Sequence, residues 1–263
     1  MKKKYDVYGI GNALVDIVTE VGHGFFAENN IEKGVMTLVD EKRQKALMKA
    51  IDMKKSRMSA GGSAANTVIG VNQFGGKSYY SCLVAKDELG RFFLEDMERN
   101  GVDTNLKYEE CPPGHTGRCL VMTTPDADRT MNTFLGISSF MSPSHLNEEA
   151  IKDAAYAYLE GYLVSSPSGM EALLETKRIA ERNKVATALT FSDPNMLRFF
   201  SKNFEEVVGA SVDLLFCNKE EALMFSETDN LKDARQKLRQ AARRFAITLS
   251  ANATSSVRIR SLR

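Results

Sequence analysis

Residues 59–66, with the sequence SAGGSAAN, are suited to holding a ligand with several hydroxyl groups. Gly61 and Gly62 carry no Cβ atom, so the backbone can approach a bound molecule closely. They open what reads as a helix of small residues near Ser63, and the first amides of a helix are unpaired donors. Asn66, one turn further along, offers both a donor and an acceptor. A tight turn into an ordinary packed helix would also explain these residues, and on this segment alone it is the simpler interpretation.

Asp16 is a second residue that could do chemistry. It follows an apolar run at residues 5–10 and lies within the apolar sequence ALVDIV. Burying an unpaired carboxylate is costly, so an acid in this position is more often functional than structural. A carboxylate there could accept two hydrogen bonds from a vicinal diol, whereas the alternative is a solvated loop acid. The nearby Gly9-Ile10-Gly11 resembles the start of a dinucleotide-binding fingerprint, but Leu14 stands where that pattern needs its third glycine.

The composition limits the class of protein. A chain of 263 residues can bury a sizeable core as one large domain, or as a domain with a small appendage. A formal net charge of +1 gives no general affinity for nucleic acid or membranes. We find no secretory signal and no apolar run of membrane-spanning length, and the four cysteines and three histidines form no metal-ligand spacing. We therefore expect a reduced, cytoplasmic protein with no membrane partner.

The order of the expected elements predicts an α/β fold. Expected strands lie at residues 5–10, 35–39, 78–84, 119–124, 129–135, 155–159, 185–191, 212–217 and 245–249. Expected helices lie at residues 41–51, from the glycine pair to about residue 75, and at 88–99, 170–182, around 203–208 and 231–244. The alternation of strands and helices in the second half implies a parallel sheet with helices on both faces. Polar residues recur just after the carboxyl ends of its strands, where open α/β sheets bind ligands.

Two expected strands, at 119–124 and 129–135, fall between helical patterns and suit a small separate sheet. The sequence Pro125-Asp126-Ala127-Asp128 is a plausible hairpin turn between them.

Seven short motifs, taken in order, resemble the ribokinase-type (PfkB) carbohydrate kinases, and within that family the adenosine kinase branch. Each motif is weak alone, but the ordered set is specific, and the resemblance runs from about Tyr5 to Ser250. The motifs are GNALVDI at 11–17, AGGSAAN at 60–66, DELG at 87–90, TG at 116–117, RTMN at 129–132, DPN at 193–195 and NKEE at 218–221.

The resemblance implies a ribokinase-like α/β domain over residues 1–249. This domain would have an open, mostly parallel sheet with helices on both faces, and a small β-sheet lid over the substrate. The lid strands are expected around 12–20, 34–40 and 116–136, and residues 250–263 are expected to form a divergent basic tail.

The family phosphorylates a hydroxymethyl group of a sugar or nucleoside with ATP and a divalent metal ion, here expected to be Mg²⁺. By position, the resemblance assigns a small-molecule substrate, best matched by adenosine, to a sugar site formed by Asn12, Asp16, Gly61, Gly62, Ser63 and Asn66. It assigns Phe134 to the apolar face of the base and Arg129 to the charge of the transferred phosphoryl group. Cofactor binding falls to Asn195, Asn218 and Glu221, and Glu221 would organise the metal through water. Plainer interpretations are that Arg129 is a surface residue of the lid and that Glu221 starts a helix.

The family's glycine-rich motif of the form D-T-x-G-A-G-D has no counterpart in this sequence. In the family its last aspartate is the general base, and its glycine amides form an anion hole for the phosphoryl group. After residue 249 the sequence instead leads into an arginine-rich finish, with no acidic residue beyond Asp233. We expect a truncated or frameshifted form of the fold with little or no activity. We also expect aggregation or partner-dependent folding, because a sheet that stops early exposes apolar surface.

Two other functions stay open on the sequence. The chain could be a kinase of the same family that acts on a free sugar such as ribose or fructose. It could also be a non-catalytic binding or interaction module whose basic tail contacts nucleic acid, which is the less favoured interpretation. The sequence gives no expectation for the oligomeric state.

Overall fold

The computed structural model describes residues 3–22, 24–124 and 129–249. In this part of the chain a seven-stranded sheet, in the order β12-β11-β10-β9-β1-β5-β6, has parallel pairing throughout. Its strands are β1 (Tyr5–Ile10), β5 (Ser78–Ser81), β6 (Asp103–Thr104), β9 (Ala154–Glu160), β10 (Ala186–Thr190), β11 (Val212–Asn218) and β12 (Ala242–Thr248). The α/β fold with a large parallel sheet is therefore confirmed.

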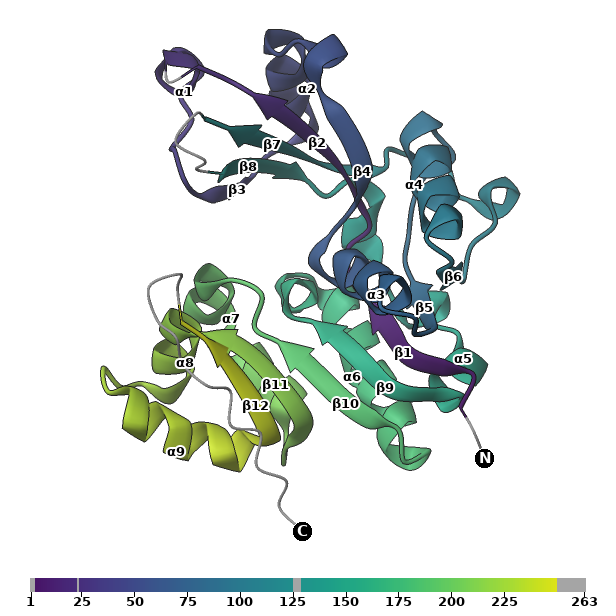
Figure 1. Cartoon of the computed structure of the whole chain (residues 1–263), viewed down its shortest axis with the longest axis vertical. Coiled ribbons are helices and arrows are strands. Elements are labelled where there is room, and N and C mark those ends of the chain that lie inside the picture. Colours follow the sequence, from purple (N-terminus) through teal and green to yellow (C-terminus); the bar gives the residue numbers. More distant parts are fainter. Residues whose placement is uncertain (1–2, 23, 125–128, 250–263) are drawn as a thin grey trace.

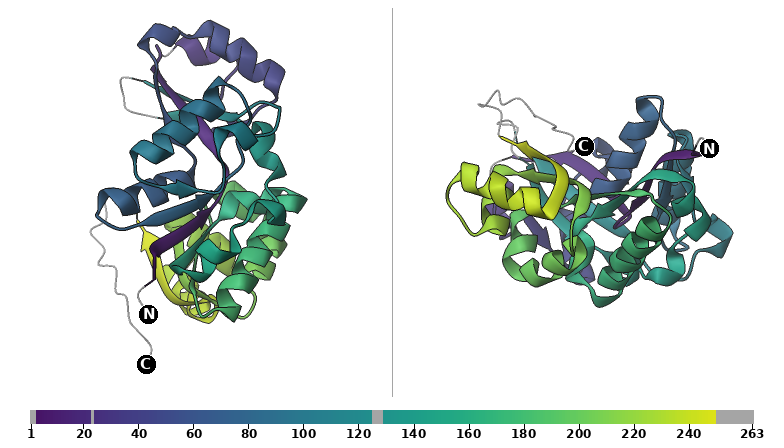
Figure 2. Two further views of the ribbon diagram at one scale, coloured as in Figure 1. Left: turned by 90° about the vertical axis from the view of Figure 1, so that its right-hand side faces the viewer. Right: turned by 90° about the horizontal axis from the view of Figure 1, so that it is seen from below.

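A smaller mixed sheet lies above the carboxyl edge of the large one (Figure 1 and Figure 2). Among the described residues it has five strands in the order β3-β8-β7-β2-β4. They are β2 (Leu14–Glu20), β3 (Met36–Leu38), β4 (Arg57–Gly61), β7 (Gly117–Thr123) and β8 (Arg129–Phe134). The expected second small sheet is present, and we refer to it below as the small sheet.

Helices cover the two faces of the large sheet, and each face has its own core. The helix α3 (Ser63–Gln73) packs over β1, β5 and β9, and Val68 lies in its core. The opposite core contains Leu159 of β9 and Leu173 of α6 (Pro167–Arg182). The remaining helices on that side are α5 (Glu148–Lys152), α7 (Pro194–Val208), α8 (Lys219–Ser226) and α9 (Leu231–Ala241).

The small sheet has one covered face and one face turned toward the large sheet. The helices α1 (Gly24–Glu28), α2 (Glu41–Ala50) and α4 (Glu88–Arg99) contribute Phe26, Leu47 and Phe93 to a shared core with Ile17 and Leu120. Because side chains alternate along a strand, the neighbouring residues of β2, β7 and β8 lie on the opposite face. That face is left to form the wall of a cavity.

Several of the sequence motifs are helix caps at the carboxyl edge. Asp87 accepts a hydrogen bond from the Gly90 amide at 2.8 Å, and Asp193 accepts one from the Asn195 amide at 2.8 Å. Capping of this kind satisfies one of the unpaired amides at a helix start. The motifs DELG and DPN therefore have a local structural reason that does not depend on a ligand.

Two expectations about the elements are wrong. The helix expected at 231–244 ends at Ala241, and β12 begins at Ala242 rather than at 245. Residues 242–244 join the strand rather than the helix because the strand conformation gives their side chains partners. Arg243 pairs with Asp213 at 3.1 Å, and Arg244 donates to the Tyr156 hydroxyl at 2.6 Å. The strand β4 is absent from the expected elements, because its short sequence RMSAG contains none of the β-branched or aromatic residues that favour strands.

Some expectations fall outside the described residues, namely the hairpin turn at 125–128 and the basic tail at 250–263. None of the helices in the described part of the chain has the length and apolarity that crossing a membrane requires.

An apolar groove lies on the α3 side of the large sheet, where β9, β10 and β11 extend beyond that helix. Its lining includes Tyr158, Leu214 and Phe216, with Val7 and Val71 at the α3 end. Phe216 is 37% exposed, and its ring centroid lies 6.4 Å from that of Tyr158. Exposed apolar surface of this kind favours association.

Replacing Phe216 with Ser should slow self-association of the chain, because it removes the most exposed aromatic side chain of the groove. Static light scattering at matched concentrations would measure the effect. Phe74→Ser is the control, because Phe74 is 96% exposed but does not line the groove. Equal self-association of Phe216→Ser and the unsubstituted chain would contradict this account.

Candidate functional site

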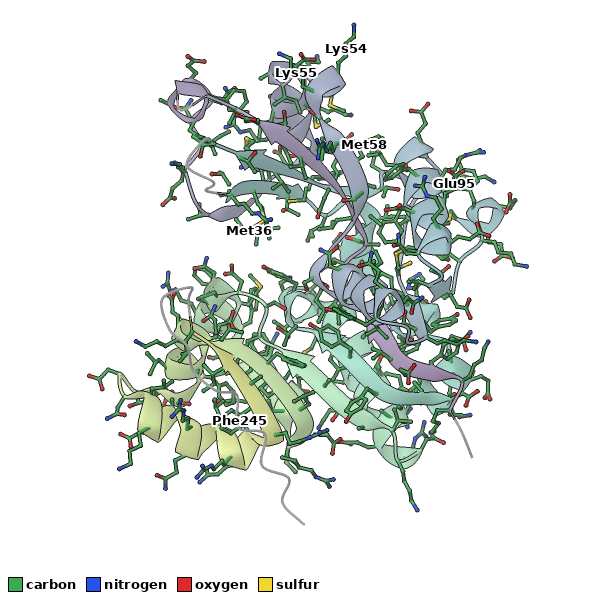
Figure 3. All side chains as sticks on the ribbon, viewed as in Figure 1. Met36, Lys54, Lys55, Met58, Glu95 and Phe245 are labelled. Carbon is green, nitrogen blue, oxygen red and sulfur yellow. The ribbon has the colours of Figure 1, made fainter. Side chains whose placement is uncertain are left out.

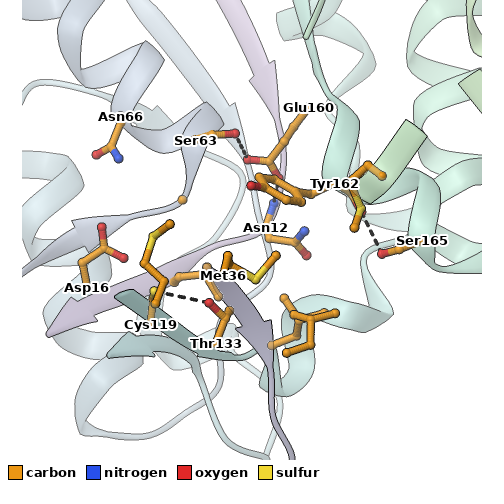
Figure 4. Close-up of a pocket in the computed structure, with 16 residues that line it drawn as sticks. Asn12, Asp16, Met36, Ser63, Asn66, Cys119, Thr133, Glu160, Tyr162 and Ser165 are labelled. Atoms are coloured by element: carbon orange, nitrogen blue, oxygen red, sulfur yellow. Dashed lines mark hydrogen bonds between the residues drawn. The ribbon is translucent and has the colours of Figure 1, made fainter. Parts of the chain in front are cut away.

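A cavity of about 190 Å³ lies between the small sheet and the carboxyl edge of the large sheet (Figure 4). One end is polar and the other is apolar. The lining consists of Asn12, Leu14, Asp16, Met36, Leu38, Gly62, Ser63, Asn66, Cys119, Met131, Thr133, Leu135, Glu160, Tyr162, Ser165 and Met196. The lining therefore brings together residues that are far apart in the sequence, from Asn12 to Met196.

The polar end brings together five residues that the sequence selected. Asn12 follows β1, Asp16 lies on β2, and Gly62, Ser63 and Asn66 belong to the start of α3. They converge because β2 pairs with β4, which runs directly into α3. This arrangement offers hydroxyl, amide and carboxylate groups to one ligand.

Asp16 is held against backbone that leaves no room for a side chain. An ideal Cβ on Gly61 would lie 2.2 Å from the Asp16 Cγ, which explains the first glycine of the pair. Gly61 packs against the Asp16 carboxylate but does not line the cavity. Burial raises the pKa of Asp16 to about 6, and the positive charge of Arg129 opposes that rise. Among the described residues no hydrogen-bond donor contributes to this pKa, so the carboxylate is available to a ligand.

The apolar end is built mainly from the small sheet. Met36 and Leu38 come from β3, and Met131 and Leu135 come from β8 and the residue after it. Figure 3 shows Met36 on the side of the small sheet that faces the large one. Met196 of α7 faces them from the large domain. A flat apolar group would find contacts on both sides here.

Phe134 does not belong to this wall, contrary to expectation. Met131 and Thr133 line the cavity, so strand alternation turns Phe134 to the other face of the small sheet. There the Arg118 guanidinium lies 5.5 Å from the centre of its ring. Leu135 takes the place that was expected for Phe134.

Glu160, at the end of β9, was not selected from the sequence. It is completely buried, and its Oε2 accepts a hydrogen bond from the Asn12 amide at 2.6 Å. Its Oε1 accepts bonds from the Ser63 hydroxyl at 2.5 Å and the Ala64 amide at 2.9 Å. Burial raises the pKa of Glu160, and these hydrogen bonds oppose the rise. An acid directly after an apolar strand is the signal that could have found it, as it did for Asp16.

The remaining candidates do not line the cavity. Arg129 is exposed at the start of β8, and alternation places it on the same face of the small sheet as Met131. Asn218 and Glu221 form a reciprocal capping box at the start of α8, with both bonds at 2.8 Å. Asn195 lies in the first turn of α7. The structure therefore gives Glu221 the local role of starting a helix.

A sequence profile of the pfkB family of carbohydrate kinases matches residues 36–258. The chain belongs to the PfkB family. Its resemblance to that family, seen first in seven short motifs, is thus confirmed, and the fold agrees with it.

Individual relatives include both nucleoside and sugar kinases. The crystal structure of adenosine kinase from Sinorhizobium meliloti superposes with a TM-score of 0.87 and 34% identity, covering 94% of this chain and 75% of that one. The adenosine kinase of Saccharomyces cerevisiae is 28% identical over 244 residues, which are 89% of this chain and 70% of the yeast protein. The 5-dehydro-2-deoxygluconokinase of Clostridium botulinum (strain Eklund 17B / Type B) is 26% identical over 183 residues. That match covers 65% of this PfkB chain and about half, 52%, of the clostridial protein.

Replacing Gly61 with Ala should destabilise this PfkB chain and displace Asp16, because the new Cβ would overlap the carboxylate. We expect a loss of about 1–3 kcal/mol in the free energy of unfolding, which urea denaturation would measure. Gly70→Ala is the control, because nothing lies within 4 Å of its ideal Cβ and alanine favours a helix. A Gly61→Ala variant as stable as Gly70→Ala would refute the close approach of Asp16.

Proposed function

We propose that the chain binds a nucleoside, with adenosine as the preferred ligand, as the acceptor of a phosphoryl group transferred from ATP to its 5′-hydroxyl. The observation that carries this proposal is the division of one cavity into a polar end and an apolar end. A nucleoside has the same division between its ribose and its base. Membership of the PfkB family and the similarity to adenosine kinases support the choice of reaction.

In this proposal the ribose lies at the polar end. The two oxygens of Asp16 accept hydrogen bonds from the 2′- and 3′-hydroxyls, and the Asn66 amide donates to or accepts from one of them. Hydrogen bonds to an ionised acceptor are stronger than bonds between neutral groups, so Asp16 would supply much of the affinity. Asn12, Gly62 and Ser63 complete the surface on which the sugar rests.

The base would lie at the apolar end, between the small sheet and Met196. Methionine side chains are flexible and polarisable, and they make favourable contacts with aromatic rings. Met36, Met131 and Leu135 supply the opposite wall. A base enclosed in this way would also help to exclude water from the site, which limits hydrolysis as a side reaction.

The donor would be ATP with Mg²⁺, bound at the carboxyl edge next to the polar end. Asp193 and Glu221 supply hard oxygen ligands of the kind that Mg²⁺ prefers. Burial raises the pKa of Glu221, and the negative charge of Asp193 raises it further against the hydrogen bond from the Asn218 amide. A cation would relieve this repulsion, so the residues fit the metal.

Among the described residues no group of three His, Cys, Asp or Glu side chains forms a set of direct ligands. The metal would therefore be held largely through water and the phosphates of ATP, as Mg²⁺ often is. Bound there, it would neutralise charge on the transferring group, and Arg129 would add to that effect. Asn195 and Asn218 would lie beside the phosphates.

The printed 263 residues contain no D-T-x-G-A-G-D motif. Without its general base and anion hole, the acceptor would be positioned but its hydroxyl would not be activated. We therefore propose that these residues bind the acceptor and transfer phosphate slowly at most. Binding, rather than turnover, is the appropriate test.

A kinase of a free sugar is the second candidate, because the polar end alone could hold a polyol and sugar kinases are among the relatives. The apolar end separates the two proposals. A free sugar would leave Met131 and Leu135 without a partner, whereas a nucleoside would cover them.

Met131→Ala should weaken the binding of adenosine about fivefold or more, and should leave any binding of ribose unchanged, because only the base reaches Met131. Isothermal titration calorimetry with adenosine, inosine and ribose would measure this. Met58→Ala is the control, because Met58 belongs to the same sheet but does not line the cavity. Ribose that binds as tightly as adenosine would favour the sugar kinase.

Asp16→Asn should weaken adenosine binding about 10- to 100-fold, the effect of losing a hydrogen bond to a charged acceptor. The unsubstituted chain should lose affinity below about pH 6, because Asp16 is protonated there. Calorimetric titrations between pH 5 and 8 would test both effects. Asp229→Asn, on the surface, is the control.

The raised pKa of Asp16 also makes the stability of the folded chain depend on pH. Its folded-state value, about 6, lies above the ordinary value of 3.8, so the folded state binds a proton more tightly. The contribution of Asp16 to stability therefore falls as pH rises through this window. Asp16→Asn should melt at a higher temperature than the unsubstituted chain at pH 7, and a lower melting temperature would contradict the environment described for Asp16.

A further inference from the structure

The Glu160 carboxylate occupies a position that would otherwise suit a bound anion. Its hydrogen-bond donors include the amide of Asn12, the hydroxyl of Ser63 and the amide of Ala64. Two of them come from the first residues of α3, where the partial positive charge of a helix is concentrated. We call these three donors the anion seat.

Gly11 is shaped to admit this carboxylate. An ideal Cβ on Gly11 would lie 2.7 Å from Oε2 of Glu160 and 2.7 Å from the Cβ of Ala64. The glycine that suggested a dinucleotide fingerprint therefore serves an internal contact. Any side chain at position 11 would push the end of β9 away from α3.

The hydrogen bonds of the anion seat hold two residues of the cavity in place. The backbone of Asn12 and the side chain of Ser63 are both bound to Glu160, and both residues line the polar end (Figure 4). Asn66 lies one turn further along the same helix. A movement of Glu160 would therefore be passed to three groups that face the ligand.

The seat also sets the electrostatics of the polar end. Among the described residues that line the cavity, the charged ones are Asp16 and Glu160, and both are acids. The negative charge of Glu160 opposes the partial positive charge at the start of α3, which makes this end of the cavity less favourable for a phosphate. An uncharged polyol suits such a surface, and a phosphorylated one does not.

We propose that Glu160 is a positioning residue that fills the anion seat, and that it thereby fixes Asn12 and the start of α3 for an uncharged acceptor. The identity of the acceptor rests on the function proposed above, whereas the filled seat does not. Both oxygens of Glu160 are used within the protein, so its effect on the ligand is exerted through Asn12, Ser63 and Asn66.

Two variants separate this role from simple packing. Glu160→Gln keeps the shape but turns one oxygen into an NH₂ group, which must then face the amide of Asn12 or of Ala64. Glu160→Ala removes the carboxylate and leaves three donors without an acceptor. Formate has the same carboxylate and is small enough to enter the space that Glu160→Ala vacates.

The first experiment measures melting temperatures in sodium formate and in sodium chloride of equal ionic strength. Formate should raise the melting temperature of Glu160→Ala by several degrees relative to chloride. It should have no such effect on the unsubstituted chain or on Glu95→Ala, whose exposed glutamate lies on α4. A folded Glu160→Ala variant that responds equally to both salts would overturn the seat.

The second experiment measures adenosine affinity by calorimetry. Glu160→Gln should bind at least tenfold more weakly than the unsubstituted chain. Glu160→Ala should also bind weakly and should recover affinity in formate but not in chloride. An affinity for Glu160→Gln equal to that of the unsubstituted chain would refute positioning.

The NMR chemical shifts of the Asn12 and Ala64 amide protons provide a third test, which requires neither a ligand nor the Glu160→Ala variant. In Glu160→Gln at least one of these protons should move upfield, because it loses its acceptor, and unchanged resonances would refute the seat. If the unsubstituted chain fails to bind adenosine, the proposed acceptor is wrong. The formate and NMR measurements still test whether Glu160 fills the anion seat.

Discussion

The hydrogen bonds around Glu160 join three segments that are far apart in the sequence. The turn after β1, the start of α3 and the end of β9 all meet at this one carboxylate. Removing any partner would leave a buried charge or a buried donor unsatisfied, which is among the more costly defects in a protein interior. The polar end of the cavity has a defined shape because this junction holds.

Asp16 and Glu160 show how environment divides roles between two buried acids. Both carboxylate oxygens of Glu160 accept hydrogen bonds from protein donors. Asp16 is buried against Gly61 with the distant charge of Arg129 as its compensation, and burial raises its pKa to about 6. A carboxylate kept in that state costs stability, and a ligand with two hydroxyl groups would offset the cost. Perturbed groups in a cavity often mark functional sites for this reason.

The features that the sequence revealed were mostly local. The glycine pair, Asp16 and Asn66 were found because their types and spacing carry a chemical meaning by themselves. The helix start at Asp87 was expected, and a helix start at Glu221 was one interpretation of the NKEE motif. Asp193 and Asn218 were noted as parts of motifs, and the structure gives them capping bonds. The order of these motifs was sufficient for the family and the fold.

The features that the sequence missed depend on register and on distant contacts. Phe134 was assigned to the cavity, but a shift of one residue in a strand reverses the face, and Leu135 lies there instead. Glu160 was missed because its three hydrogen-bond partners are about 100 to 150 positions away in the sequence, and only the fold brings them together. The strand β4 gains its structure from pairing with β2, which its own sequence does not indicate.

A crystal structure of the chain with adenosine would test the central claim most directly. The account predicts the 2′- and 3′-hydroxyls within about 3 Å of the Asp16 carboxylate, and the adenine between Met196 and the wall formed by Met131 and Leu135. Adenosine bound outside this cavity, or bound in it with the base against Asp16, would contradict the account.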